Sequence, residues 1–179
     1  MKTAAAVVLF LLAAALAQAP VPATMAVPAG IAAWPVAGTS FALSYEGTAK
    51  PSFNTVRIDP SSFAAYVKTG AFPAGTVLAL EVRAARTEVA PAKGGETEGA
   101  VLSTSLHVKD ERAGPGTWTF YTYQPGAARA TAVPRTRSCY TCHAQEAQQD
   151  TAFTQFYPSL TNGAGRPEPG PNPGHSDAF

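Results

Sequence analysis

The feature that most constrains the fold is a series of segments in which apolar and polar residues alternate. The clearest is TVLALEVRAART, residues 76–87, in which alternate residues from Thr76 to Val82 share one face. Four other segments show a similar pattern: 41–47, 52–58, 100–110 and 117–123. Glycine and proline, 15 and 16 residues, supply many turns. The sequence therefore predicts a mainly β (α+β) fold built on an antiparallel five-stranded sheet.

Two segments predict helices. A short helix follows Asp59, which can cap it, with Pro60 at the first helical position and Gly70 as the stop. The second helix is expected over residues 138–156, which contain no glycine or proline and are rich in alanine, glutamine and glutamate. The predicted fold is thus a sheet followed by one C-terminal helix.

The two ends of the chain are expected to lie outside the domain. Lys2 precedes an apolar run with two small-residue cleavage sites, so residues 1–19 predict a signal peptide cleaved after Ala17 or Ala19. An uncleaved membrane anchor is the alternative, for which the run is short. We expect export to the periplasm, a flexible arm at 20–30, one domain at 31–160 and a disordered tail at 161–179.

The charge of the chain narrows the choice of partners. Of the 13 lysines and arginines, removal of Lys2 leaves 12, against 12 acidic residues. No run of basic residues is present, and after the leader no apolar segment approaches the ~18 residues that span a bilayer. We therefore expect no nucleic-acid partner and no membrane association of the mature protein.

The sequence CYTCH holds both cysteines of the chain, Cys139 and Cys142, followed by His143. A redox disulfide is expected beside a βαβ pattern, structural zinc needs four ligands, and a structural disulfide at this spacing would close almost no loop. On a helix, both thiols can instead reach the vinyl groups of one porphyrin while the imidazole reaches its iron. The motif predicts one haem c per chain, with His143 as the axial ligand.

The second axial ligand decides whether the iron is open. No methionine follows His143, and Met25 is the only one expected in the mature chain. His175 falls in the tail, and His107 alternates with the apolar Leu106 and Val108, which favours a surface position. We therefore expect five-coordinate iron with an open or apolar distal side, suited to NO, CO or peroxide rather than to electron transfer alone.

The CYTCH block, with Asp150, Phe153 and the Tyr157–Pro158 pair after it, resembles the haem segment of the cytochrome P-460 and cytochrome c′-beta family. Upstream matches are Trp34 with Gly38–Thr39, IDPSSFAAYVKTGAFPAGTV, VKD at 108–110 and GTWTFY at 116–121. The resemblance spans about 31–160. It implies a mainly antiparallel β fold that carries c-type haem on a late helix, and usually a homodimer.

The resemblance also separates two branches of the family. In cytochromes P-460 a strand lysine is cross-linked to the porphyrin, and Leu80 stands where that lysine is expected. An aliphatic side chain cannot form this bond, which favours the c′-beta branch with its distal phenylalanines. Phe53 and Phe72 are the candidates for these, and Arg57 is a candidate distal arginine.

These patterns favour a gas-binding protein, chiefly for NO and also for CO, that acts in scavenging, sensing or transport. A cytochrome P-460-like oxidoreductase acting on hydroxylamine or NO, or a peroxidase, is the alternative. Electron transfer with a redox partner is a third reading.

Overall fold

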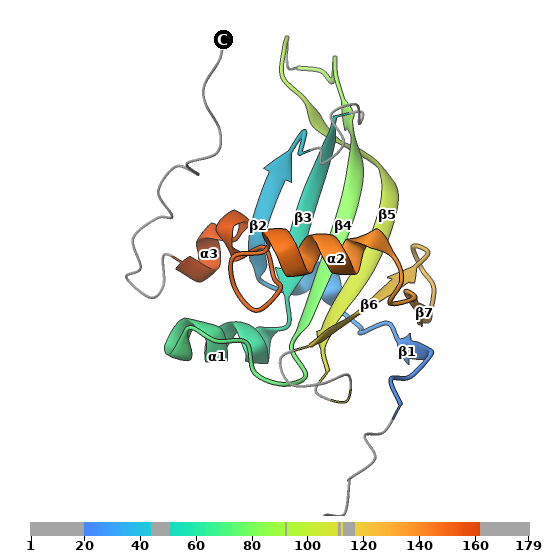
Figure 1. Ribbon diagram of the computed structural model, residues 1–179. Coiled ribbons are helices and arrows are strands. Elements are labelled where there is room, and N and C mark those ends of the chain that lie inside the picture. The colour runs from blue at the N-terminus through green and yellow to red at the C-terminus, as the bar shows by residue number, and fades with distance from the viewer. Residues whose placement is uncertain (1–19, 44–50, 92, 111, 113–116, 162–179) are drawn as a thin grey trace, which may run out of the picture.

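The computed structural model describes residues 20–43, 51–91, 93–110, 112 and 117–161 (Figure 1). Within them a seven-stranded antiparallel sheet has the order β1-β7-β6-β5-β4-β3-β2. The strands are β1 (Thr24–Ala26), β2 (Val36–Phe41), β3 (Ser52–Ile58), β4 (Val77–Arg86), β5 (Thr97–Lys109), β6 (Trp118–Tyr123) and β7 (Arg129–Ala132). The helices are η1 (Ile31–Ala33), α1 (Pro60–Thr69), α2 (Ser138–Glu146), η3 (Thr154–Phe156) and α3 (Pro158–Thr161).

The predicted mainly β fold with an antiparallel sheet is confirmed, but the described residues form seven strands rather than five. The two additional strands, β1 and β7, are three and four residues long and rich in alanine and threonine, so neither shows a clear alternation. Strand β1 lies within residues 20–30, for which a flexible arm is predicted, and pairs with β7. The first of the five predicted strands, residues 41–47, overlaps the observed strand β2 only at Phe41. Strand β2 begins at Val36 and ends at Phe41, and residues 44–50 lie outside the described part of the chain.

The two predicted helices differ in outcome. Helix α1 is confirmed, with the Asp59 carboxylate accepting a hydrogen bond from Ser62 N at 2.9 Å and Gly70 ending the helix at φ 72°. The second helix was expected to reach residue 156, but α2 ends at Glu146. Asp150 and Thr151 then have φ values of 53° and 54°, which an α-helix cannot contain. Contacts of this segment with the sheet therefore outweigh its helical propensity.

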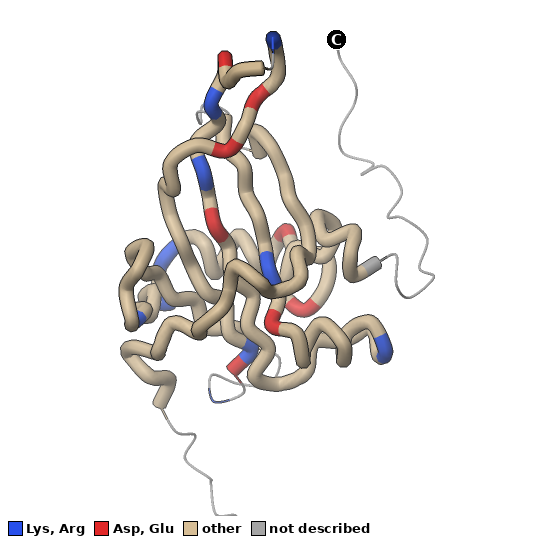
Figure 2. The backbone as a smooth tube through the Cα atoms, turned by 180° about the vertical axis from the view of Figure 1, so that it is seen from behind, with Lys and Arg blue, Asp and Glu red and all other residues tan. Residues whose placement is uncertain are grey.

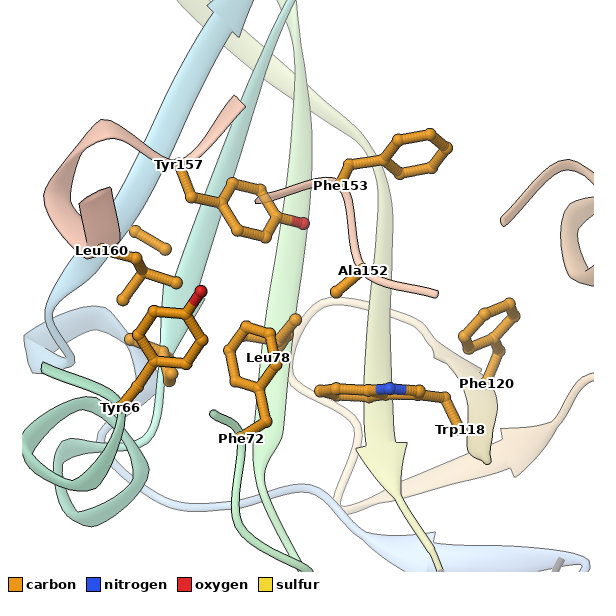
Figure 3. Close-up of a cluster of buried hydrophobic side chains, with 11 residues drawn as sticks. Tyr66, Phe72, Leu78, Trp118, Phe120, Ala152, Phe153, Tyr157 and Leu160 are labelled. Carbon is orange, nitrogen blue, oxygen red and sulfur yellow. The ribbon is translucent and has the colours of Figure 1, made fainter. Parts of the chain in front are cut away.

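Each face of the sheet is covered by a different part of the chain. The front face packs against α1, α2 and the segment after α2, and Figure 1 shows α2 lying across it. Its largest buried residues include Tyr66, Phe72, Trp118 and Phe120, which Figure 3 shows in close-up. The back face packs against the N-terminal segment of β1 and η1 over a smaller cluster around Leu106 and Tyr121. Both faces of the central strands are therefore covered.

Figure 2 shows lysines, arginines and acidic residues distributed along the described chain. No helix in the described part of the chain combines the length and the hydropathy needed to cross a membrane. The predicted signal peptide, residues 1–19, lies outside the described residues, as does the predicted tail from residue 162 onward.

Candidate haem-binding site

A cavity of about 420 Å³ lies between α2 and the front face of the sheet. Helix α2 contributes Cys139, Cys142 and His143, and the segment after it contributes Phe153, Phe156 and Tyr157. The sheet side is lined by Gly38, Ser40, Leu43, Asn54, Val56, Leu78, Leu80 and His107. The walls are mostly apolar, and the size is typical of a site for a cofactor or small molecule.

Tyr140, the second residue of CYTCH, fastens α2 to the sheet. Its hydroxyl accepts a hydrogen bond from Phe120 N at 2.9 Å and donates to Val133 O at 3.2 Å. Its ring stacks on Phe120 with the centroids 4.3 Å apart, and the Arg135 guanidinium lies 4.6 Å from the ring centroid. With Tyr140 held in this way, Cys139 and Cys142 line the cavity as two half-buried free thiols.

His143 is oriented by the backbone of the segment after α2. Its Nδ1 lies 2.8 Å from the Thr151 carbonyl oxygen, which can only accept, so Nδ1 carries the proton and Nε2 keeps its lone pair. Burial lowers the pKa of His143, and the bond to Thr151 opposes this effect. A neutral imidazole with a free Nε2 is the form that binds a metal.

His107 also lines the cavity, so the surface position predicted for it is wrong. The register places it opposite both Leu78 and Phe120, on the front face. Its ring centroid is 4.2 Å from that of Phe120 and 5.1 Å from that of His143. Burial, and secondarily the charge of a protonated His143, lowers the pKa of His107 to about 3.

A signal for this position was present in the sequence. The neighbouring strand has aromatic residues on both of its faces, Trp118 and Phe120 on one and Tyr121 and Tyr123 on the other. A strand paired with one that is covered on both sides is itself covered on both sides. The apolar face of β5 packs under the N-terminal segment, which leaves His107 for the cavity.

The other residues predicted for the distal pocket are divided between the two faces of the sheet. Leu80 lines the cavity. Phe53 and Arg57 lie on the back face, since they pair with Arg83 and Ala79, and Arg57 donates to Trp34 O at 3.1 Å. The structure therefore does not bring either of them to the cavity.

Phe72 lies on the front side but in the core below the cavity. Its ring packs between Tyr66 and Trp118, with centroid distances of 4.4 and 5.3 Å (Figure 3). It is 3% exposed and is not among the residues that line the cavity. The sheet wall also carries the small polar side chains of Ser40 and Asn54, for which the sequence held no signal.

These residues fit a haem. Two free thiols at i and i+3 can each form a thioether, and a neutral imidazole at i+4 has its lone pair free and its other nitrogen hydrogen-bonded. The mostly apolar walls suit the porphyrin.

One comparison with known proteins bears on this assignment. The family model described as Cytochrome P460 matches residues 28–154, which include every strand from β2 to β7 and all of α2. A comparison with curated proteins gave no match. The matched segment covers well over half of the 179 residues and includes both thiols and His143. The chain therefore belongs to the cytochrome P460 family and is a haem protein.

Proposed function

We propose that this chain is a periplasmic haem c protein that binds small gases, chiefly NO and also CO, at five-coordinate iron. Cys139 and Cys142 hold the haem covalently, and His143 is the axial ligand of the iron. The bound haem supplies an iron with one open coordination position. The protein supplies an attachment helix, a fixed imidazole and a mostly apolar wall.

The observation that carries this proposal is the composition of the sheet wall. Leu78, Leu80, Val56 and Leu43 form its apolar part, and neither a lysine nor a methionine is among the described residues that line the cavity. A strong sixth ligand would therefore have to be a histidine. Met25 packs against the back face of the sheet, away from the cavity.

His107 is the one candidate sixth ligand that needs separate consideration. The ring of His107 lies 5.1 Å from that of His143 at 75° and packs on the Phe120 ring with a centroid distance of 4.2 Å. These two ring contacts support a packing role for His107 beside His143 rather than iron ligation.

The preference for NO follows from ligand chemistry. NO binds iron without needing a hydrogen bond from the protein, whereas bound O₂ gains from one. The apolar part of the wall, formed by Leu43, Val56, Leu78 and Leu80, therefore supports a preference for NO and CO. The biological role that fits such a site is scavenging, sensing or transport of NO.

Absorption spectra of the ferric and ferrous protein, with and without CO and NO, test this function. We expect a five-coordinate ferrous spectrum that shifts on addition of either gas. A low-spin ferrous spectrum that CO leaves unchanged would mean a strong sixth ligand and would rule out gas binding. Absence of a c-type haemochrome in pyridine would rule out covalent attachment.

A second candidate is an oxidoreductase that acts on hydroxylamine, NO or peroxide. Ser40 and Asn54 favour it, because a hydroxyl and a carboxamide in the cavity wall can hydrogen-bond a polar substrate. Leu80 disfavours the cross-linked form of such an enzyme. Turnover of hydroxylamine with an artificial electron acceptor would support this candidate, and a lack of turnover in a protein that binds NO would support the first.

We also propose a homodimer, as the family resemblance implies. Phe41 and Leu102 are 45% and 59% exposed, so both side chains could pack against a second copy of the chain. Light scattering on the purified protein gives its mass directly. A monomeric mass at micromolar concentration would contradict the dimer without affecting the haem assignment.

A further inference from the structure

The turn that orients His143 has a strained backbone. Asp150 and Thr151 follow one another with φ values of 53° and 54°, and neither is a glycine. Left-handed conformations are unfavourable for residues that carry a Cβ. Two of them in sequence persist only where surrounding contacts hold them.

An ion pair in the front core holds this turn. The Asp150 carboxylate lies 2.6 Å from Nζ of Lys109, and the two side chains are only 23% and 14% exposed. Lys109 is the last residue of β5, and its Nζ also donates to Phe72 O at 2.7 Å. The cation therefore joins the end of the sheet, the chain before β4 and the turn.

A second contact fixes the turn from the other side. The Gln149 side-chain oxygen accepts a hydrogen bond from the Tyr66 hydroxyl at 2.7 Å, and its nitrogen donates to Gly70 O at 2.7 Å. The residue before Asp150 is thus tied to the end of α1. The turn held by these contacts contains the Thr151 carbonyl, which accepts a hydrogen bond from Nδ1 of His143.

We infer that Lys109 and Asp150 are positioning residues for the axial histidine: their ion pair holds the Thr151 carbonyl against His143 and so sets the electron donation of its imidazole. A hydrogen bond from Nδ1 to a fixed acceptor makes the imidazole a stronger donor, which stabilises ferric over ferrous iron. A relaxed turn weakens this bond. The inference rests on the proposed attachment of haem through CYTCH, but not on gas binding.

The test is a variant that removes the ion pair without changing the net charge, Lys109→Met with Asp150→Asn. Asparagine tolerates the left-handed conformation, so the backbone preference of the turn is kept. We expect a higher reduction potential, with the ferric–ferrous equilibrium moved about tenfold or ~59 mV for one electron. The Fe–His stretching frequency in the resonance Raman spectrum of the ferrous protein should fall.

The matched control removes an ion pair of similar geometry on the back face, Glu81→Gln with Arg83→Met. Arg83 lies 2.6 Å from the Glu81 carboxylate and donates to Gly99 O at 3.1 Å, much as Lys109 bonds Asp150 and Phe72 O. This variant also keeps the net charge. It should leave both the potential and the Fe–His frequency at the values of the unmodified protein.

Two single variants extend the test. Lys109→Arg keeps the cation and should retain the original potential. Asp150→Asn alone keeps an acceptor for Lys109 but loses the charge, so it should give a smaller shift of the same sign even where the double variant does not fold. A folded variant without the ion pair whose potential and Fe–His frequency are unchanged would overturn the inference. A preparation without a c-type haemochrome would instead overturn the haem attachment.

Discussion

Gly38 lies where strand β2 meets the segment that follows α2, and an alanine there should destabilise the protein. A Cβ at this position would lie 2.0 Å from the Phe156 carbonyl oxygen and 3.1 Å from Tyr157 Cα. Real Cβ atoms essentially never approach another atom closer than 3.0 Å, so one of the two backbones must move by at least about 1 Å. The obstacle is main chain, which cannot rotate away as a side chain can.

The size of the effect follows from two opposing contributions. Forcing extra volume into a packed site costs up to about 3 kcal/mol. Replacing glycine by alanine also removes conformations from the unfolded chain, which stabilises by roughly 0.4–1 kcal/mol. We therefore expect Gly38→Ala to lower the free energy of unfolding by about 2 kcal/mol.

Urea denaturation followed by circular dichroism measures this change, and Gly94→Ala is the control. A Cβ at Gly94 meets no atom within 4 Å, so this variant should be as stable as the original protein or slightly more stable. Equal midpoints for the two variants would refute the steric argument. Because Phe156 and Tyr157 line the cavity, Gly38→Ala should also change the rate of CO binding, whereas Gly94→Ala should not.

Three further predictions concern stability at low pH, the cavity wall and the axial ligand. Burial acts to raise the pKa of Asp59, but hydrogen bonds from Ser61, Val77 and Ser62 outweigh it and lower the pKa below the ordinary 3.8. The ionised Asp59 therefore stabilises the fold above about pH 4, and this stabilisation is lost as the pH falls further. Asp59→Ala should therefore cost about 1–2 kcal/mol at pH 7 and remove part of the acid sensitivity, and a pH–stability profile parallel to that of the original protein would contradict this. Leu80→Lys places an amine in the cavity wall and should alter the haem absorption spectrum; an unchanged spectrum would mean that this side chain does not meet the porphyrin. His143→Ala should abolish normal iron ligation while both thioethers still form, and CO binding like that of the original protein would refute the axial assignment.

Local signals in the sequence predicted much of this fold. Helix α1 was predictable from Asp59, Pro60 and Gly70, because these residue types prefer the N-cap, the first helical position and the C-terminal end of a helix. Leu78 and Leu80 of β4 share the face that lines the cavity, as the alternation predicts. The thiols and imidazole of CYTCH are brought to one cavity because their spacing matches one side of a helix.

What the sequence did not predict depends on register and on long-range contacts. The alternation of residues in β3 predicts that Asn54 and Val56 share one face and that Phe53 and Arg57 share the other. Only the pairing of β3 with β4 decides which of these faces lines the cavity. Helix α2 stops at Glu146 because the turn after it is held by contacts to α1 and β5 that no local pattern encodes. Strands as short as β1 and β7 exist only through their pairing with each other and with β6.

The pairing of β7 has a consequence for how ligands enter. This strand has three paired positions with β1 and two with β6, and only residues 133–137 separate it from α2. Such a sparsely bonded corner is expected to open before the rest of the sheet, in fluctuations well below global unfolding. Each opening would release the start of α2, which places Cys139 in the cavity wall. Under the proposed function, β1 therefore influences gas entry through the strand it pairs with, and amide hydrogen exchange at Ala130 should follow the rate of CO binding.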